Sequence, residues 1–154
     1  MKKVFMQMAI DLAIENIKNG GGPFGAVIVK DNEVVATGVN RVTATNDPTA
    51  HAEVSAIRAA CQKLGTFILS GCEIYSSCEP CPMCLGAIYW SHLDRLYYGA
   101  NKVDAADAGF DDSFIYKELE ISPSQRRVRT RILMSKEALK VFEAWKTQDD
   151  KIEY

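Results

Sequence analysis

The fold of this chain is decided by the stretch Ser77-Cys78-Glu79-Pro80-Cys81-Pro82-Met83-Cys84, because it joins a buried strand to a helix. The strand is predicted over residues 72–77 and the helix over residues 82–90, with Pro82 at the first helical position, where a missing N–H is tolerated. Cys81 then lies near the N-cap, where free N–H groups and the helix dipole favour a thiolate. Since Cys81 and Cys84 are three residues apart, they share one side of the helix.

A second segment, Thr49-Ala50-His51-Ala52-Glu53, supplies the groups that complete a metal site. Zinc binds imidazole nitrogen and thiolate sulfur, and a catalytic zinc keeps three protein ligands and one open position. We predict that His51, Cys81 and Cys84 are these ligands. Two thiolates offset the charge of the metal, so a water in the fourth position needs a neighbouring base, and Glu53 is the candidate.

The spacing of His51 and Glu53 sets a geometric condition. Residues two apart on a regular helix point about 200° away from one another. Both side chains can reach one pocket only if His51 sits at the start of the helix, before the regular turns begin. Pro48 and Thr49 just upstream favour such a start.

Other uses of the cysteines are weighed against this site. Cys78-x-x-Cys81 and Cys81-x-x-Cys84 both have the spacing of a redox pair. An iron–sulfur run would place a further cysteine at residue 88, which is isoleucine, so that interpretation fails. A structural zinc site would need a fourth protein ligand, for which Cys78 or His92 is available.

The remaining pattern predicts alternating helices and strands. Helices are expected over residues 2–18, 49–64, 82–90, 112–119 and 136–146, and strands over residues 24–30, 33–40, 72–77, 93–100 and 128–134. This order predicts a single α/β domain over residues 1–154, a three-layer α/β/α sandwich with a central mixed five-stranded sheet and an antiparallel pair at one side. The hairpin turn is expected at Asp31-Asn32.

Periodicity predicts which helix faces are buried. The expected stripe of the first helix is Val4, Met8 and Leu12, and that of the second is Val54, Ile57, Cys61 and Leu64. Cys61 and Cys72 are therefore expected as small core residues, not as ligands.

Composition narrows the class of protein. The chain has 154 residues, of which 47% are hydrophobic and 25% charged, and a net charge of −2, which argues against a nucleic-acid-binding surface. Asp11, Glu15 and Asn16 interrupt the apolar stretch near the N-terminus, so we expect neither a signal peptide nor a membrane span. A cytoplasmic location, where cysteines stay reduced, follows as an expectation.

The two segments match a known signature. His51-Ala52-Glu53 followed by Pro80-Cys81-Pro82-Met83-Cys84 resembles the His-x-Glu…Pro-Cys-x-x-Cys pattern of the cytidine-deaminase-like zinc deaminases. The resemblance implies one zinc ion per chain that activates a hydroxide. It also implies that Glu53 carries protons from that water to the leaving amine.

A narrower resemblance, to small bacterial guanine deaminases, covers nearly the whole chain. It rests on Gly22-Pro23-Phe24-Gly25-Ala26, on residues 46–53, on residues 77–90 and above all on Ala108-Gly109-Phe110-Asp111-Asp112-Ser113-Phe114-Ile115-Tyr116. It implies hydrolysis of guanine to xanthine and ammonia. Plant guanosine deaminases share similar segments, so guanosine or another nucleoside stays open as the substrate.

The same resemblance associates Asn40, Asp112 and Tyr154 with the purine pocket. Asp112 would accept a hydrogen bond from the 2-amino group and help it leave as ammonia, although it could instead only cap the following helix. Asn40 could bind a base edge or merely form a turn.

Three further residues are counted with the substrate-binding set. Phe24 and Trp90 could stack on the purine, and the alternative for both is a core position. Ala52, between His51 and Glu53, completes the set.

The last residues, Lys151-Ile152-Glu153-Tyr154, would close over a site in the resembled enzymes. This implies a homodimer in which the C-terminal segments are exchanged. The alternative is a frayed terminus without a role.

Three other functions compete. A tRNA adenosine deaminase would use the basic patch Arg126-Arg127-Val128-Arg129-Thr130-Arg131. The net charge of −2 gives no wider support for binding RNA. A non-enzymatic zinc-binding module would leave Glu53 without a role. A thiol oxidoreductase would need Cys81 and Cys84 to form a reversible disulfide without metal.

Overall fold

The structure is a computed structural model that describes residues 2–154 and divides into two compact units. The first unit ends at Asp112 and the second comprises Ser113–Tyr154. Each unit is described by itself. The expectation of one functional domain over residues 1–154 stays a prediction.

A mixed sheet forms the centre of the first unit. Its strands are β1 (Gly25–Lys30), β2 (Glu33–Val39), β3 (Cys72–Cys78) and β4 (Arg95–Ala100), in the order β2-β1-β3-β4. β1 runs antiparallel to both β2 and β3, whereas β3 and β4 are parallel. The prediction of an α/β fold with a mixed sheet is confirmed, with four strands in place of five.

The β1–β2 hairpin turns at Asp31 and Asn32, as predicted. Their φ angles of 51° and 62° are both left-handed, which is the signature of a type I′ turn and a conformation that Asp and Asn tolerate. The register shifts between Ile28 and Val29, where a β-bulge lies.

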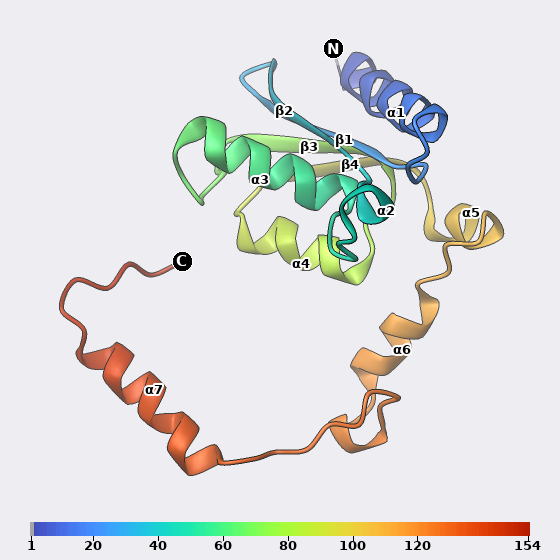
Figure 1. Ribbon diagram of the computed structural model, residues 1–154. Helices are drawn as coiled ribbons and strands as arrows, with labels where there is room; N and C mark the ends of the chain where they lie inside the picture. Colours follow the sequence, from blue (N-terminus) through green and yellow to red (C-terminus); the bar gives the residue numbers. More distant parts are fainter. Residues whose placement is uncertain (1) are drawn as a thin grey trace. The chain divides into compact units, whose positions relative to one another are not determined.

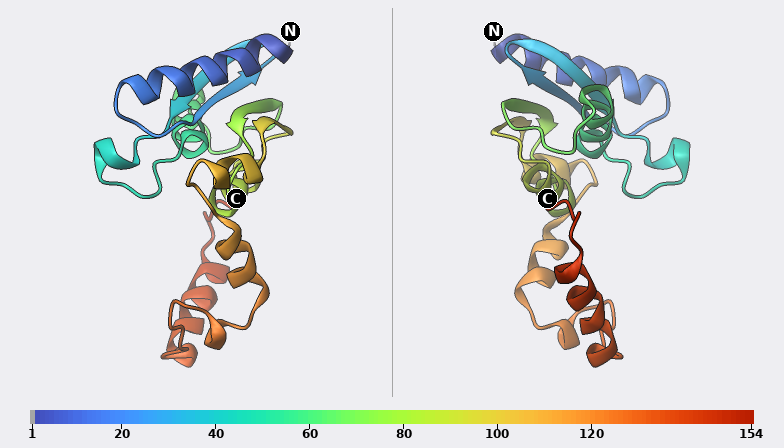
Figure 2. Two further views of the ribbon diagram at one scale, coloured as in Figure 1. Left: turned by 90° about the vertical axis from the view of Figure 1, so that its right-hand side faces the viewer. Right: turned by 90° about the vertical axis from the view of Figure 1, so that its left-hand side faces the viewer.

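Helices cover both faces of this sheet (Figures 1 and 2). On one face, α1 (Lys2–Lys18) packs Phe5 and Ala9 against Val27 and Tyr75. On the other face lie α3 (Ala52–Leu64) and α4 (Pro82–Trp90). The core on that side is built by Ala26, Ile28, Ala52, Ala56, Ile57, Ala60, Leu69, Cys72, Ile74 and Ile88. The first unit therefore has the three layers that the element order predicts.

The predicted buried stripes of α1 and α3 are right in part, because Ile57 is buried and Met8, Leu12 and Cys61 pack against the core. α1 buries Phe5, Ala9 and Ala13, while Val4 is 62% exposed. α3 buries a row of alanines beside Ile57, and Leu64 is exposed. Each helix comes closest to the sheet along its row of alanines, and the larger side chains Phe5 and Ile57 are buried beside that row.

Glycines on the strands permit this close approach. A Cβ built on Gly25 would lie 2.3 Å from the Ala9 carbonyl oxygen in α1. A Cβ on Gly38 would lie 2.2 Å from the Ala52 carbonyl oxygen at the start of α3. The backbone of each helix therefore touches a strand, and this contact fixes the height of the α3 N-terminus above the sheet.

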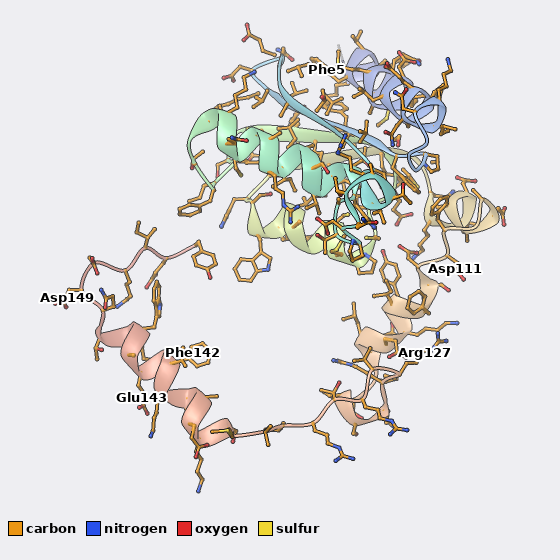
Figure 3. All side chains as sticks on the ribbon, viewed as in Figure 1. Phe5, Asp111, Arg127, Phe142, Glu143 and Asp149 are labelled. Atoms are coloured by element: carbon orange, nitrogen blue, oxygen red, sulfur yellow. The ribbon has the colours of Figure 1, made fainter. Side chains whose placement is uncertain are left out.

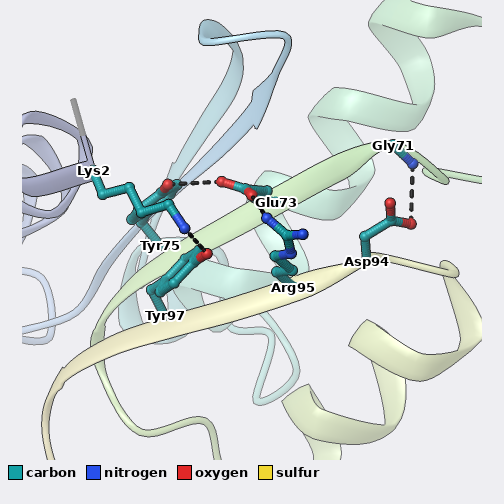
Figure 4. A network of polar contacts seen from close by, with 7 residues as sticks. All are labelled: Lys2, Gly71, Glu73, Tyr75, Asp94, Arg95 and Tyr97. Carbon is teal, nitrogen blue, oxygen red and sulfur yellow. Dashed lines mark hydrogen bonds and ion pairs between the residues drawn. The ribbon is translucent and has the colours of Figure 1, made fainter.

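Polar contacts also bind the N-terminal end of α1 to the sheet (Figure 4). Lys2 donates to the Tyr97 hydroxyl and also lies over the Tyr97 ring. The Tyr75 hydroxyl donates to Glu73 at 2.8 Å, and Arg95 forms an ion pair with the same carboxylate at 3.1 Å. Burial raises the pKa of Tyr75 well above its usual range, so its hydroxyl stays a donor. The network joins α1, β3 and β4.

Two short helices of the first unit were not predicted. They are α2 (Val42–Thr45) and α5 (Lys102–Asp107). Asn101 caps α5, because its side chain accepts from the N–H groups of Val103 and Asp104 and the Asp104 carboxylate accepts in return. α5 leads into the segment that ends at Asp112.

The second unit contains α6 (Ser113–Glu120), the 3₁₀ helix η1 (Pro123–Gln125) and α7 (Ser135–Thr147). The predicted fifth strand over residues 128–134 is wrong, because none of these described residues is in a strand. Its alternating pattern is that of a half-buried strand, yet Val128 and Ile132 are both largely exposed, and no described strand of this unit offers a hydrogen-bonding partner. Figure 3 labels Phe142 and Glu143 on adjacent positions of α7.

No helix among residues 2–154 is both long and apolar enough to cross a bilayer.

Candidate metal centre

His51 is the N-cap of α3, which begins at Ala52. Its φ and ψ of −70° and 159° are extended, so its side chain leaves the chain before the regular helix turns begin. Because Glu53 lies in the first turn, His51 and Glu53 face the same region. The geometric condition derived from the sequence is met.

Cys81 and Cys84 stand at the start of α4 in the same manner. Cys81 is its extended N-cap, Pro82 follows at the first turn, and Cys84 lies one turn on and is fully buried. Two helix N-termini, those of α3 and α4, thus converge on one point. Their dipoles favour negative charge there.

The three side chains approach one another closely. The His51 Nδ1 atom lies 3.5 Å from the Cys81 Sγ and 3.4 Å from the Cys84 Sγ. All three ligand atoms lie within 4.8 Å of one another. A tetrahedral zinc with ordinary bond lengths separates nitrogen and sulfur ligands by about 3.5 Å, so the group has the dimensions of a zinc site.

The pKa shifts of the two thiols are also consistent with a site that binds a cation. The hydrogen bond from Cys84, followed by that from His51, lowers the pKa of Cys81 to about 4. The pKa of Cys84 is raised, because its proton is held by the Cys81 thiolate and because the side chain is buried. The pKa of His51 is raised by its contact with Cys81. One thiolate forms readily here, and a second requires a positive ion to balance it.

No fourth protein ligand joins this group among the described residues. The Cys78 Sγ lies 3.7 Å from the Asn101 carbonyl oxygen, to which it donates, and His92 is an exposed residue beyond the C-terminal end of α4. A structural zinc site would need either Cys78 or His92 as its fourth protein ligand. Three protein ligands leave one coordination position for water or substrate, as in catalytic zinc sites.

The Glu53 side chain lies beside the metal ligands and is only 5% exposed. Burial raises the pKa of its carboxyl group. The Ser76 hydroxyl in β3 donates to its Oε1 atom at 3.2 Å. A buried carboxyl group with a raised pKa can hold a proton and release it again, as acid–base catalysis requires.

Asp112 is partly buried. The pKa of its carboxyl group is raised by that burial and then by the negative charge of Cys81. Its contact with the substrate stays a prediction.

Asn40 and Phe24 belong to a neighbouring wall. The Asn40 N–H donates to the Phe24 carbonyl oxygen at 3.2 Å, and its side-chain Oδ1 accepts from the Val42 N–H at 3.2 Å. The Phe24 ring contacts the Phe110 ring edge-on, with centroids 5.0 Å apart. The side chain of Asn40 forms a turn with the backbone of Val42, which was its alternative role. Phe24 pairs with Phe110, which lies two residues before Asp112 in the sequence.

Two of the predicted residues, Trp90 and Ala52, add no side chain to the group of metal ligands, and the role of a third, Tyr154, stays a prediction. Trp90 ends α4, about 13 Å along the helix from Cys81 at the ordinary rise per residue, and it is 67% exposed. Tyr154 belongs to the second unit and is exposed. Ala52 is fully buried, so only its backbone could reach a ligand.

Two residues at the site were missed by sequence reasoning. Ser76 had a usable signal, because it is a polar residue in the row Cys72, Ile74, Ser76 and Cys78, which faces the core. Phe110 was quoted within a segment but given no role, and its contact with Phe24 joins residues far apart in the sequence.

Comparison with known proteins agrees with this geometry. The family described as "Cytidine and deoxycytidylate deaminase zinc-binding region" matches residues 1–100. The guanine deaminase of Bacillus subtilis (strain 168) is 52% identical over 153 residues, which cover 99% of this chain and 98% of that protein. Its X-ray structure superimposes with a TM-score of 0.96 over 99% of this chain and 98% of that chain.

More distant relatives share less of the chain. A tRNA-specific adenosine deaminase of Aquifex aeolicus is 40% identical over 64% of this chain and 66% of its own length. A structure of the guanine deaminase of Nitrosomonas europaea is 36% identical, with a TM-score of 0.67 over 70% of this chain and 63% of that chain.

Proposed function

Since this chain belongs to the zinc-binding cytidine and deoxycytidylate deaminase family, we propose that it hydrolyses guanine to xanthine and ammonia. The observation that carries the chemistry is the convergence of His51, Cys81 and Cys84 beside a buried Glu53. Support for the substrate comes from similarity to a guanine deaminase over 99% of the chain. The similarity to a tRNA-specific adenosine deaminase covers only 64%.

His51, Cys81 and Cys84 would hold the zinc ion. Zinc in such a site supplies a Lewis acid and lowers the pKa of a bound water. The Glu53 carboxylate, whose Oε1 accepts a hydrogen bond from the Ser76 hydroxyl, would take a proton from the attacking water. Glu53 then gives that proton to the departing amine, so one water is consumed and one ammonia released.

Asp112 is proposed to select the base. Its carboxylate would accept a hydrogen bond from the 2-amino group of guanine, which adenine and cytosine present differently. A mismatched base would leave this partly buried acceptor unpaired, at a cost of about 1–3 kcal/mol. Phe24 and Asn40 would form the adjoining wall of the pocket. Trp90, Ala52 and Tyr154 stay predicted substrate contacts.

One assay tests the proposal directly. The purified protein is incubated with guanine, guanosine, adenine, cytosine and a tRNA, and ammonia release is measured for each. We expect release from guanine to be fastest. Release from guanosine alone would identify a nucleoside deaminase, and inosine formation in tRNA alone would identify an RNA enzyme; either result would overturn the proposal.

We also propose a homodimer in which the C-terminal segments are exchanged. Support comes from the second unit, where none of the described residues 113–154 is buried. α7 exposes Leu139, Phe142 and Trp145, spaced three apart along one face. Exposed apolar surface of this kind marks an interaction site, and a second copy would bring Tyr154 to a site.

Complementation tests this exchange. Glu53→Gln with an intact C-terminus is co-expressed with a chain lacking residues 151–154 but retaining Glu53. Exchange predicts that the mixed dimer recovers activity at the intact Glu53, whereas activity no higher than the sum of the two variants alone would contradict it. A cytoplasmic location belongs to the same proposal, because the thiolate ligands must stay reduced.

A further inference from the structure

Ser76 occupies an unusual place for a polar residue. It lies in β3 between Ile74 and Cys78 in the row that faces α3, and it is only 2% exposed. A buried hydroxyl must find a hydrogen-bond partner to offset its lost hydration. The partner here is Glu53, and the two residues are 23 positions apart in the sequence.

The contact restrains one specific atom. The Ser76 Oγ lies 3.2 Å from the Glu53 Oε1. With one oxygen fixed by the strand, the other oxygen of the carboxyl group has a defined direction. Because a hydroxyl can both donate and accept, the same contact persists whether Glu53 carries its proton or not. A backbone N–H could not serve both states.

We propose that Ser76 is a positioning residue for the proposed deamination, acting through Glu53 by fixing the rotamer of its carboxyl group. The inference rests on the proposed function of Glu53 as the proton carrier. The Ser76 hydroxyl makes its hydrogen bond to Glu53, so Ser76 would act on the reaction through that carboxyl group. Its loss therefore slows the chemical step without weakening substrate binding.

A double-mutant cycle tests this mechanism. Ser76→Ala is expected to lower kcat about tenfold with KM unchanged, the scale of a lost hydrogen bond to a charged group. In a Glu53→Asp background the carboxylate is withdrawn by one methylene, so adding Ser76→Ala should change kcat less than twofold. Rates are measured at a raised enzyme concentration with guanine still in excess, so that slow turnover is recorded and kcat and KM are both obtained. An equal loss in both backgrounds would overturn the proposal.

The neighbouring serine supplies a matched control. The Ser77 hydroxyl accepts from the Gly25 N–H at 3.1 Å and does not contact Glu53. Ser77→Ala removes the same atom from the same strand, and it should lower the melting temperature while leaving kcat within twofold. Ser76→Thr restores a hydroxyl at the original position and should recover most of the rate. A rate that stays low in Ser76→Thr while zinc content and melting temperature match the wild type would also count against the proposal.

The outcome is distinguishable from failure of the proposed function. If the wild type released no ammonia from guanine, the deaminase assignment would fall. If the wild type is active and Ser76→Ala matches it in kcat, only the role of Ser76 falls. Zinc content, measured for every variant, should stay at one per chain.

Discussion

Glu53 and Asp112 are two carboxyl groups with different surroundings near the same three ligands. Glu53 is buried and hydrogen-bonded to Ser76, whereas Asp112 is partly exposed and feels the charge of Cys81. Burial is the main cause of the raised pKa at both groups. We propose proton transfer for the first and substrate recognition for the second, because Glu53 is buried and Asp112 is partly exposed.

Glu53→Gln should keep zinc and lose most of the activity. The amide has nearly the same shape but cannot carry a proton, so kcat should fall by at least about 10²–10⁴-fold. Ammonia release and zinc content are measured on the same sample. Turnover near the wild-type rate would remove Glu53 from the mechanism.

Asp112→Asn should reduce guanine turnover while leaving zinc content unchanged. The lost negative acceptor weakens the contact with the 2-amino group, for an expected loss in kcat/KM of about 10–100-fold. Asp112 also directly precedes α6. Because Asn caps a helix as well as Asp does, an unchanged kcat/KM in this variant would leave Asp112 with capping as its only role.

At the scale of elements, α3 must lie at a fixed height above the sheet, since its N-cap is the ligand His51. Gly38 on β2 sets that height by its contact with the backbone of Ala52 and Ala56. A side chain at residue 38 would push the start of α3 away from the strand. The metal centre therefore depends on a glycine in a strand that contributes no ligand.

Gly38→Ala should destabilise the fold by about 1–3 kcal/mol, the usual cost of overpacking, and should also weaken zinc binding. Gly86→Ala in α4 is the control, because a Cβ there has no atom within 4 Å outside the helix's own turns. It should raise stability by about 1 kcal/mol. Urea unfolding and zinc titration measure both effects, and equal behaviour of the two variants would contradict the packing argument.

Local sequence predicted the ligand-bearing helix starts well and the buried helix faces only in part. Pro82 after Cys81, and Pro48 with Thr49 before His51, act within a few residues, so their effect on the backbone could be foreseen. The buried faces of α1 and α3 depend on Gly25 and Gly38 across the sheet, which spacing within a helix does not reveal. The large apolar residues of the predicted stripes lie beside the close contact, and alanines fill it.

At the scale of the whole molecule, the structure divides into two compact units, and one functional domain over residues 1–154 stays a prediction. The first contains the sheet and the candidate metal centre. The second, residues 113–154, has no buried residue and carries the apolar face of α7. The prediction of a strand over residues 128–134 was wrong. An alternating pattern of apolar and polar residues does not show whether a neighbouring strand is available for pairing.

Removing residues 151–154 should lower guanine turnover about tenfold or more while the first unit keeps its zinc. The proposed reason is that Tyr154 closes a pocket in a dimer. Steady-state kinetics and zinc content measure the effect, with Tyr154→Phe as the control that keeps the ring. Unchanged kinetics in the truncated chain would leave Tyr154 without a role.

The central claim is an open zinc site with one imidazole and two thiolates. X-ray absorption at the zinc edge of the purified protein measures it most directly. We predict one zinc per chain with two sulfur and two nitrogen or oxygen neighbours, one of which exchanges when an inhibitor binds. A protein without zinc, or a zinc held by three or more sulfurs, would contradict it.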